Sequence, residues 1–201
     1  TIPAKDRAVL PGLINTHIHL IGAHLKGVTM SHTRYHVAKR GYFLPMEKAY
    51  PKRINMSLAS DWCSNDLWQY MKFAILVPRT ITGNVEMLSG WDALEMAAMG
   101  GARSLGMADE IDSLEAGKKA AIILMEISRP SFRPIRADNF CSNLVYNATG
   151  ADVSDVYVDG NPIVQDRDVM TIDRAEMNRE VQHRAEAIWA RAEKNFQRIN
   201  P

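Results

Sequence analysis

The chain has 201 residues, of which 46% are hydrophobic and 23% are charged, and its formal net charge is +1. This is the composition of an ordinary globular protein with one or two domains. The nearly balanced charge gives no reason to expect a nucleic acid or an anionic membrane as a partner.

The two cysteines, Cys63 and Cys141, lie far apart in the sequence. No apolar run approaches the roughly 18 residues of a membrane-spanning helix, and the first residues show no secretory segment. We therefore expect reduced thiols in a cytoplasmic protein with no membrane partner. For Cys63, inert burial is favoured over a metal-binding role beside Asp61.

Residues 9–20 are expected to form a strand, because an apolar run follows Pro11 and Gly12. Such a run is typical of a buried, parallel-type strand. His17 and His19 then point to the same face, with Cα atoms about 6.6 Å apart. Two imidazoles at this spacing can bind one metal ion, although His-x-His by itself more often belongs to packing or to the surface.

Residues 53–59 alternate polar and apolar side chains, which predicts another strand. The strand leads to Asp61, immediately before a predicted helix. Catalytic groups project from this place in an α/β barrel, whereas an isolated Asp there is more often a helix cap. Asp61 is therefore a candidate metal ligand with capping as the alternative.

Two helices are predicted next. Apolar residues at helical spacing indicate a helix over residues 65–77 that ends before Pro78. Ser89 and Asp92 resemble an N-cap pair, and the helix that they begin is expected to run to Gly106.

From Ser113 onward the sequence predicts a small β layer. A turn leads into an apolar strand, and shorter strands are expected at 143–148, 155–159 and 162–165, the last two joined by an Asp159-Gly160 hairpin. A final helix begins at Asp173 and carries an apolar stripe that we expect to dock on the body of the protein or on a subunit of a homo-oligomer. The stripe consists of Met177, Val181, Ala185, Ile188, Ala192 and Phe196.

Three stretches together resemble the amidohydrolase superfamily, in its branch of triazine hydrolases, cytosine-deaminase-like enzymes and S-adenosylhomocysteine-type deaminases. Residues 11–19 (PGLINTHIH) resemble the first barrel strand, and residues 54–67 (INMSLASDWCSNDL) resemble the eighth strand and its turn. Residues 113–121 resemble the return to the small β-sandwich, although Asp112 and Ala121 replace the usual Gly and Asp. The resemblance implies an α/β fold, a (β/α)8 TIM-type barrel with a small β-sandwich.

The resemblance also implies a division of the chain and a deficit. Residues 1–112 would hold the first, seventh and eighth barrel strands, 113–172 the β-sandwich portion, and 173–201 the C-terminal helix. A complete barrel needs about 250 residues, and no residues here match the second to sixth strands or the His and Glu ligands that they carry. Either these are retained parts of a longer amidohydrolase, which we favour, or the chain has an internal deletion.

The implied function is a metal-dependent hydrolase of non-peptide carbon–nitrogen bonds in a heterocycle, an amide or a urea. In the family the first-strand histidines, here His17 and His19, hold a divalent metal. The Asp that matches Asp61 contacts the metal and forms a hydrogen bond with the bound water. Zinc is expected first, with iron or manganese as alternatives, and Trp62 would flank a small-molecule substrate unless it packs in the core. A two-metal hydantoinase-type relative would need a bridging lysine, for which the chain has no candidate in context. The rival hypothesis is an inactive remnant with a structural or subunit-interface role.

Overall fold

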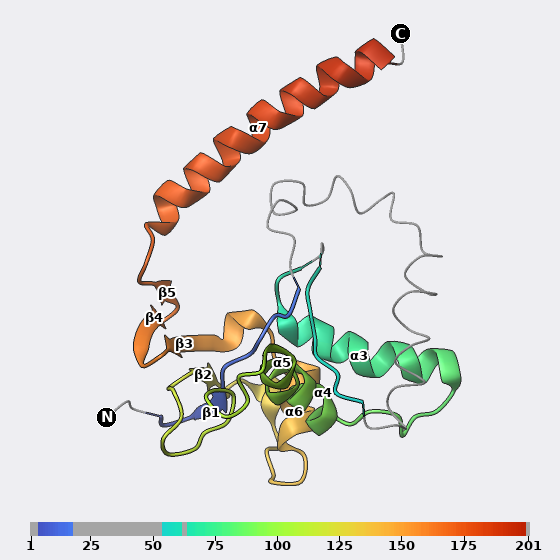
Figure 1. Ribbon diagram of the computed structural model, residues 1–201, viewed down its shortest axis with the longest axis vertical. Helices are drawn as coiled ribbons and strands as arrows, with labels where there is room; N and C mark the ends of the chain where they lie inside the picture. Colours follow the sequence, from blue (N-terminus) through green and yellow to red (C-terminus); the bar gives the residue numbers. More distant parts are fainter. Residues whose placement is uncertain (1–3, 18–53, 62–63, 200–201) are drawn as a thin grey trace.

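The computed structural model describes residues 4–17, 54–61 and 64–199 (Figure 1). A five-stranded sheet lies beside a group of helices, and a long C-terminal helix extends away from both. No helix among the described residues is long and apolar enough to cross a membrane. The helices are α3 (Leu67–Thr82), α4 (Gly90–Ala97), α5 (Met99–Leu105), α6 (Phe140–Asn147) and α7 (Arg174–Ile199), with short 3-10 turns at Pro130–Phe132 and Gly150–Asp152.

The sheet is antiparallel throughout, with its strands in chain order. The Asp159-Gly160 hairpin is confirmed, since both residues have positive φ angles of 50° and 77°. The division of the chain at residues 112 and 172 stays a prediction, although the sheet joins strands from both sides of residue 112. The strands are β1 (Arg7–Pro11), β2 (Ile122–Glu126), β3 (Val153–Val158), β4 (Asn161–Gln165) and β5 (Asp168–Val169).

The strand expected over residues 9–20 is wrong in its extent and in its pairing. β1 ends at Pro11 and pairs with β2 in the antiparallel sense. Beyond it, Gly12 still donates a hydrogen bond to the Ala121 carbonyl (2.9 Å), but Ile14 donates to the Ala97 carbonyl of α4 (2.8 Å). The chain thus leaves the sheet at the Pro11-Gly12 step and passes to the helices.

The helix predicted to end before Pro78 continues for another turn. α3 includes Pro78 and ends at Thr82, where it is capped by Gly83 with a left-handed φ of 70°. The Thr82 hydroxyl donates to the Pro78 carbonyl (2.9 Å), and the Arg79 guanidinium donates to the carbonyls of Met87 and Leu88. These side-chain bonds stabilise the last turn despite the missing proline N–H.

The single helix expected after Ser89 is two helices. Its capping box is confirmed: the Ser89 hydroxyl accepts from the Asp92 N–H, and the Asp92 carboxylate accepts from the Ser89 N–H. The helix breaks at Ala98 because the carbonyls of Met96 and Ala97 accept hydrogen bonds from Leu58 and Ile14 instead of continuing the helix.

Residues 143–148 were expected to form a strand and instead lie within or just after α6. Leu144 and Val145 are fully buried, and Phe140 lies one turn earlier against the same core, which is helical spacing. α6 packs so closely on α4 that a Cβ atom on Gly90 would lie 2.6 Å from the Ser142 Cα. Tertiary packing therefore decides a segment whose short apolar run is locally ambiguous.

Gly100 brings α5 against the segment that leads to Asp61. A Cβ atom at this position would lie 2.1 Å from the Met56 carbonyl oxygen, a backbone atom that cannot turn aside. We expect Gly100→Ala to lower the free energy of unfolding by about 2–3 kcal/mol in urea denaturation, because α5 must shift away. Gly106→Ala is the control: its φ is 70° but its surroundings are open, so a loss of only about 1 kcal/mol is expected. Equal losses would contradict the packing argument.

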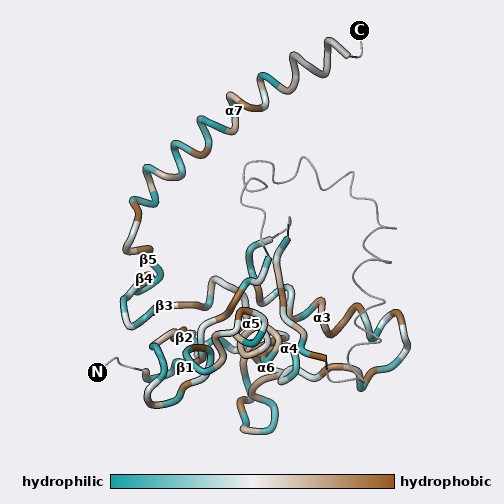
Figure 2. The backbone as a smooth tube through the Cα atoms, viewed as in Figure 1, coloured by the Kyte–Doolittle hydropathy of each residue, from teal (hydrophilic) through white to brown (hydrophobic). Residues whose placement is uncertain are grey.

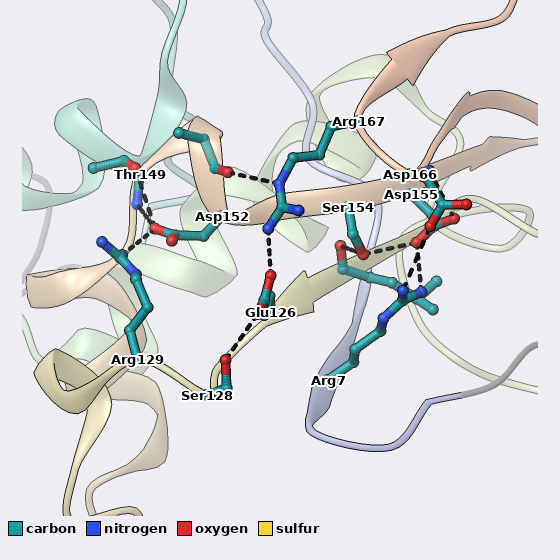
Figure 3. A network of polar contacts seen from close by, with 12 residues as sticks. Arg7, Glu126, Ser128, Arg129, Thr149, Asp152, Ser154, Asp155, Asp166 and Arg167 are labelled. Atoms are coloured by element: carbon teal, nitrogen blue, oxygen red, sulfur yellow. Dashed lines mark hydrogen bonds and ion pairs between the residues drawn. The ribbon is translucent and has the colours of Figure 1, made fainter.

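Ion pairs tie β1, β2 and β3 together (Figure 3). Arg7 Nη1 lies 2.8 Å from Asp155 Oδ2 on β3, and Arg129 Nη2 lies 2.5 Å from the buried Asp152 carboxylate. The Arg167 guanidinium pairs with Glu126 and, together with the Ser128 hydroxyl, holds the pKa of Glu126 below its ordinary value. This network stabilises the sheet, and we assign it no catalytic or ligand-binding role.

The predicted start of the last helix is confirmed, since Glu176 donates its N–H to Asp173 Oδ1 at 2.9 Å. Brown and teal alternate along α7 in Figure 2, and the helix extends away from the sheet. Met177, Val181 and Ile188 of the stripe are partly exposed, whereas Ala185 is buried. Docking of the stripe on the body of the protein or on a second copy of the chain stays a prediction.

Candidate metal centre

The candidate site lies between two extended segments that run side by side, described over residues 12–17 and 54–61 (Figure 1). Thr16 donates its N–H to the Leu58 carbonyl (3.2 Å), and Asp61 donates its N–H to the His17 carbonyl (3.1 Å). Because both bonds advance in the same direction along the two segments, the segments run parallel. The Thr16 hydroxyl adds a bond to the Leu58 carbonyl at 3.0 Å.

His17 and Asp61 face each other across these segments. The His17 Nε2 atom lies 3.5 Å from Asp61 Oδ1, and the two side chains are 60% and 36% exposed. The structure therefore brings together two of the residues singled out from the sequence, although they are separated by more than forty positions. An imidazole nitrogen and a carboxylate oxygen are both zinc ligands, and their exposure leaves them accessible.

The backbone of Asp61 is in the left-handed region, with a φ of 50°. Asp is one of the few residues other than Gly that adopts this conformation readily. Such backbone conformations gather at active sites when the surrounding structure fixes them. Asp61 stands six positions before α3, which begins at Leu67.

The capping alternative for Asp61 is not what the structure shows. The N-cap of α3 is Asp66, whose carboxylate accepts the Trp68 N–H at 3.0 Å. The Ser64 hydroxyl accepts the Asp66 N–H at 3.2 Å. The carboxylate of Asp61 lies against His17 and does not cap α3.

The other predicted site residues are not placed. His19 and Trp62 lie outside the described residues, as do Cys63 and the histidines between positions 18 and 53. Within residues 4–17, 54–61 and 64–199, no three His, Cys, Asp or Glu side chains come together as a metal site. The observed geometry thus supplies a pair of donors, with His19 as the predicted third.

Asn15 and Ser60, which the sequence analysis does not single out, support the His17–Asp61 pair from the two segments that carry it. Asn15 and Ser60 bond to each other across the two segments, and Tyr70 of α3 donates to the Ser60 carbonyl at 2.7 Å. The available signal was the position of Asn15, an amide at the end of an otherwise apolar run two residues before His17.

Comparison with protein families matches residues 40–163 to the amidohydrolase family. The chain belongs to this family. The match includes the segment that carries Asp61, helices α3 to α6, strands β2 and β3 and the start of β4. The family expected from the sequence motifs is therefore confirmed.

Curated relatives of this chain are named as deaminases. It is 33% identical over 150 residues to a 5-methylthioadenosine/S-adenosylhomocysteine deaminase of Caldanaerobacter subterraneus, covering 73% of this chain and 34% of the relative. It is 34% identical over 171 residues to a 5'-deoxyadenosine deaminase of Methanosarcina mazei, covering 83% and 39%. The chain thus spans between a third and two fifths of the length of these relatives.

Two solved structures that contain zinc resemble this chain in fold. An adenosine deaminase from Xanthomonas campestris with bound zinc gives a TM-score of 0.62 at 26% identity, covering 68% of this chain and 32% of that one. An atrazine chlorohydrolase from Arthrobacter aurescens complexed with zinc gives 0.59 at 21% identity, covering 70% and 32%, a likeness of fold alone. These likenesses confirm that the described part of the chain has an amidohydrolase-type fold. The complete barrel and the β-sandwich stay predictions for this chain.

Proposed function

We propose that this chain belongs to a metal-dependent hydrolase that breaks carbon–nitrogen bonds in a heterocycle. Its substrate is an adenosine-type nucleoside, from which it removes the amino group. The observation that carries the proposal is the 3.5 Å approach of His17 Nε2 to Asp61 Oδ1 across two parallel segments. The deaminase names of the relatives support the substrate class. A small β-sandwich beside a barrel remains the expected architecture.

The donors present fit a divalent metal. Imidazole and carboxylate groups together suit zinc, and three protein ligands leave a position for water. His17 and Asp61 would hold the ion, with His19 as the third ligand. When bound, such a metal lowers the pKa of water toward 7 and so supplies hydroxide at neutral pH.

The chain's own residues then supply orientation and proton transfer. The Asp61 carboxylate accepts the proton of the attacking water as general base and returns it to the departing amino group. Water adds to the ring carbon that carries the amine, the carbon–nitrogen bond breaks, and ammonia leaves with the proton that Asp61 returns. The second proton of the water ends on the adjacent ring nitrogen, so that an oxo group replaces the amine. Trp62 would flank the heterocycle.

Metal removal tests this proposal. Treatment of the protein with a chelator is expected to lower ammonia release from 5'-deoxyadenosine at least about tenfold, because water loses its activating ion. Adding Zn²⁺ should restore the rate, whereas adding Mg²⁺, which prefers oxygen ligands, should not. Ammonia release that is unchanged by the chelator would contradict the mechanism.

Metal content separates the enzyme from the inactive remnant. About one tightly held zinc, iron or manganese ion per chain is expected for the enzyme and none for the remnant. X-ray anomalous scattering at the metal absorption edges would identify the ion and its ligands together.

A further inference from the structure

The side chain of Asn15 joins the two segments that carry His17 and Asp61. Its Nδ2 donates to Ser60 Oγ at 2.7 Å, and its Oδ1 accepts the Ser60 N–H at 3.1 Å. The same Oδ1 accepts the His17 N–H at 3.3 Å. One amide side chain thus bonds to the residue before Asp61 and to His17 itself.

Ser60 transmits this restraint to Asp61. It is fully buried, and its carbonyl accepts the Tyr70 hydroxyl at 2.7 Å. That carbonyl and the Asp61 N–H belong to one planar peptide unit, and the N–H donates to the His17 carbonyl at 3.1 Å. Since both ends of the peptide are bonded, its plane is fixed, and the left-handed φ of Asp61 is held in place.

We propose that Asn15 is a positioning residue that sets the separation of His17 and Asp61, so that both donors are already placed for a divalent metal. Asn15 does not itself bind the ion, because its amide nitrogen and oxygen are both engaged by Ser60 and His17. This role rests on the proposed metal-dependent function. It resembles the orientation of metal ligands by their hydrogen-bonded neighbours in other metalloproteins.

Zinc affinity tests the proposal. Asn15→Leu keeps the size of the side chain and removes its hydrogen bonds, so Zn²⁺ affinity in competition with a chromophoric chelator should fall about 10–100-fold. Asn15→Asp should stay within a few-fold of wild type, because its two oxygens can accept the same N–H groups and the Ser60 hydroxyl proton.

Asn55→Leu is the matched control. Asn55 also ties the second segment to a neighbour, since its Nδ2 donates to the Gly100 carbonyl at 3.1 Å and its Oδ1 accepts from Arg103 Nε at 2.8 Å. These bonds lie at the other end of the segment from Asp61. The variant should lower stability in urea without altering zinc affinity.

Hydrogen exchange of the Asp61 amide supplies a readout that needs no metal. Asn15 does not bond to this amide, so faster exchange in Asn15→Leu, and not in Asn55→Leu, would show that the positioning is transmitted. If Asn15→Leu binds zinc as tightly as wild type, or if Asp61 exchange is unchanged, the positioning role is wrong while the proposed function stands. A wild-type chain without zinc affinity overturns the proposed function, and the exchange at Asp61 then decides the positioning role by itself.

Discussion

An Asp61→Asn variant is expected to release ammonia from an adenosine-type substrate about 10²–10⁴-fold more slowly than wild type, the usual contribution of a general base. The amide has nearly the same size as the carboxylate, and Asn adopts a φ of 50° readily, so the local backbone should persist. What is lost is the negative charge that faces His17 Nε2 at 3.5 Å and the oxygen that accepts the proton. The measurement is kcat/KM from ammonia release.

Asp66→Asn is the control for this prediction. Asp66 lies five positions further on and caps α3 through the Trp68 N–H, while its other oxygen accepts the Gly150 N–H at 3.2 Å. Asn is as good an N-cap as Asp, so this variant should keep its activity. If Asp61→Asn retains activity within threefold of wild type, Asp61 is not the base.

The proximity of His17 and Asp61 could be anticipated from the sequence because its signals are local, while their role as metal ligands stays a prediction. His17 and Asp61 each follow a short extended segment, and the ends of such segments are where functional groups gather in parallel α/β folds. The role of Asn15 could not be found in the same way. Its partner Ser60 is distant in the sequence, and nothing in a single sequence shows that an amide and a hydroxyl will meet.

The fold was predicted best where a pattern has one physical solution. The Ser89–Asp92 capping box and the Asp159-Gly160 hairpin require particular residues at particular positions, and both were confirmed. The break at Ala98 was missed because it depends on Ile14 and Leu58 taking the carbonyl groups of α4. Tertiary hydrogen bonds of this kind override local helix preference.

Asp112 combines an unfavourable backbone conformation with a buried carboxylate, at a position where the family resemblance implies glycine. Its φ is 71°, in the left-handed region where glycine is strain-free. The residue is 2% exposed, and neither carboxylate oxygen has a hydrogen-bond partner. Burial raises the pKa of Asp112 to about 6, and the Lys118 ammonium only partly offsets the rise. That ammonium is itself engaged by the Ala108 carbonyl at 2.6 Å.

The direction of the pH effect follows from this raised pKa. Between pH 3.8 and about 6 the folded chain retains a proton on Asp112 that the unfolded chain has lost. Stability must therefore fall as the pH rises through this window. Above it, the buried charge costs about 3 kcal/mol, the equivalent of the pKa difference.

Asp112→Gly is therefore expected to raise the free energy of unfolding by about 2–3 kcal/mol at pH 7 and by less than about 1 kcal/mol at pH 4. Relief of the left-handed strain and the greater entropy of unfolded glycine roughly cancel, so the charge dominates. Urea unfolding of variant and wild type at both pH values gives the measurement. Asp159→Gly is the matched control, because Asp159 has a φ of 50° but is exposed; its effect should be small at both pH values. If Asp112→Gly stabilises the protein equally at pH 4 and pH 7, backbone strain and not the buried charge is the main cost of Asp112.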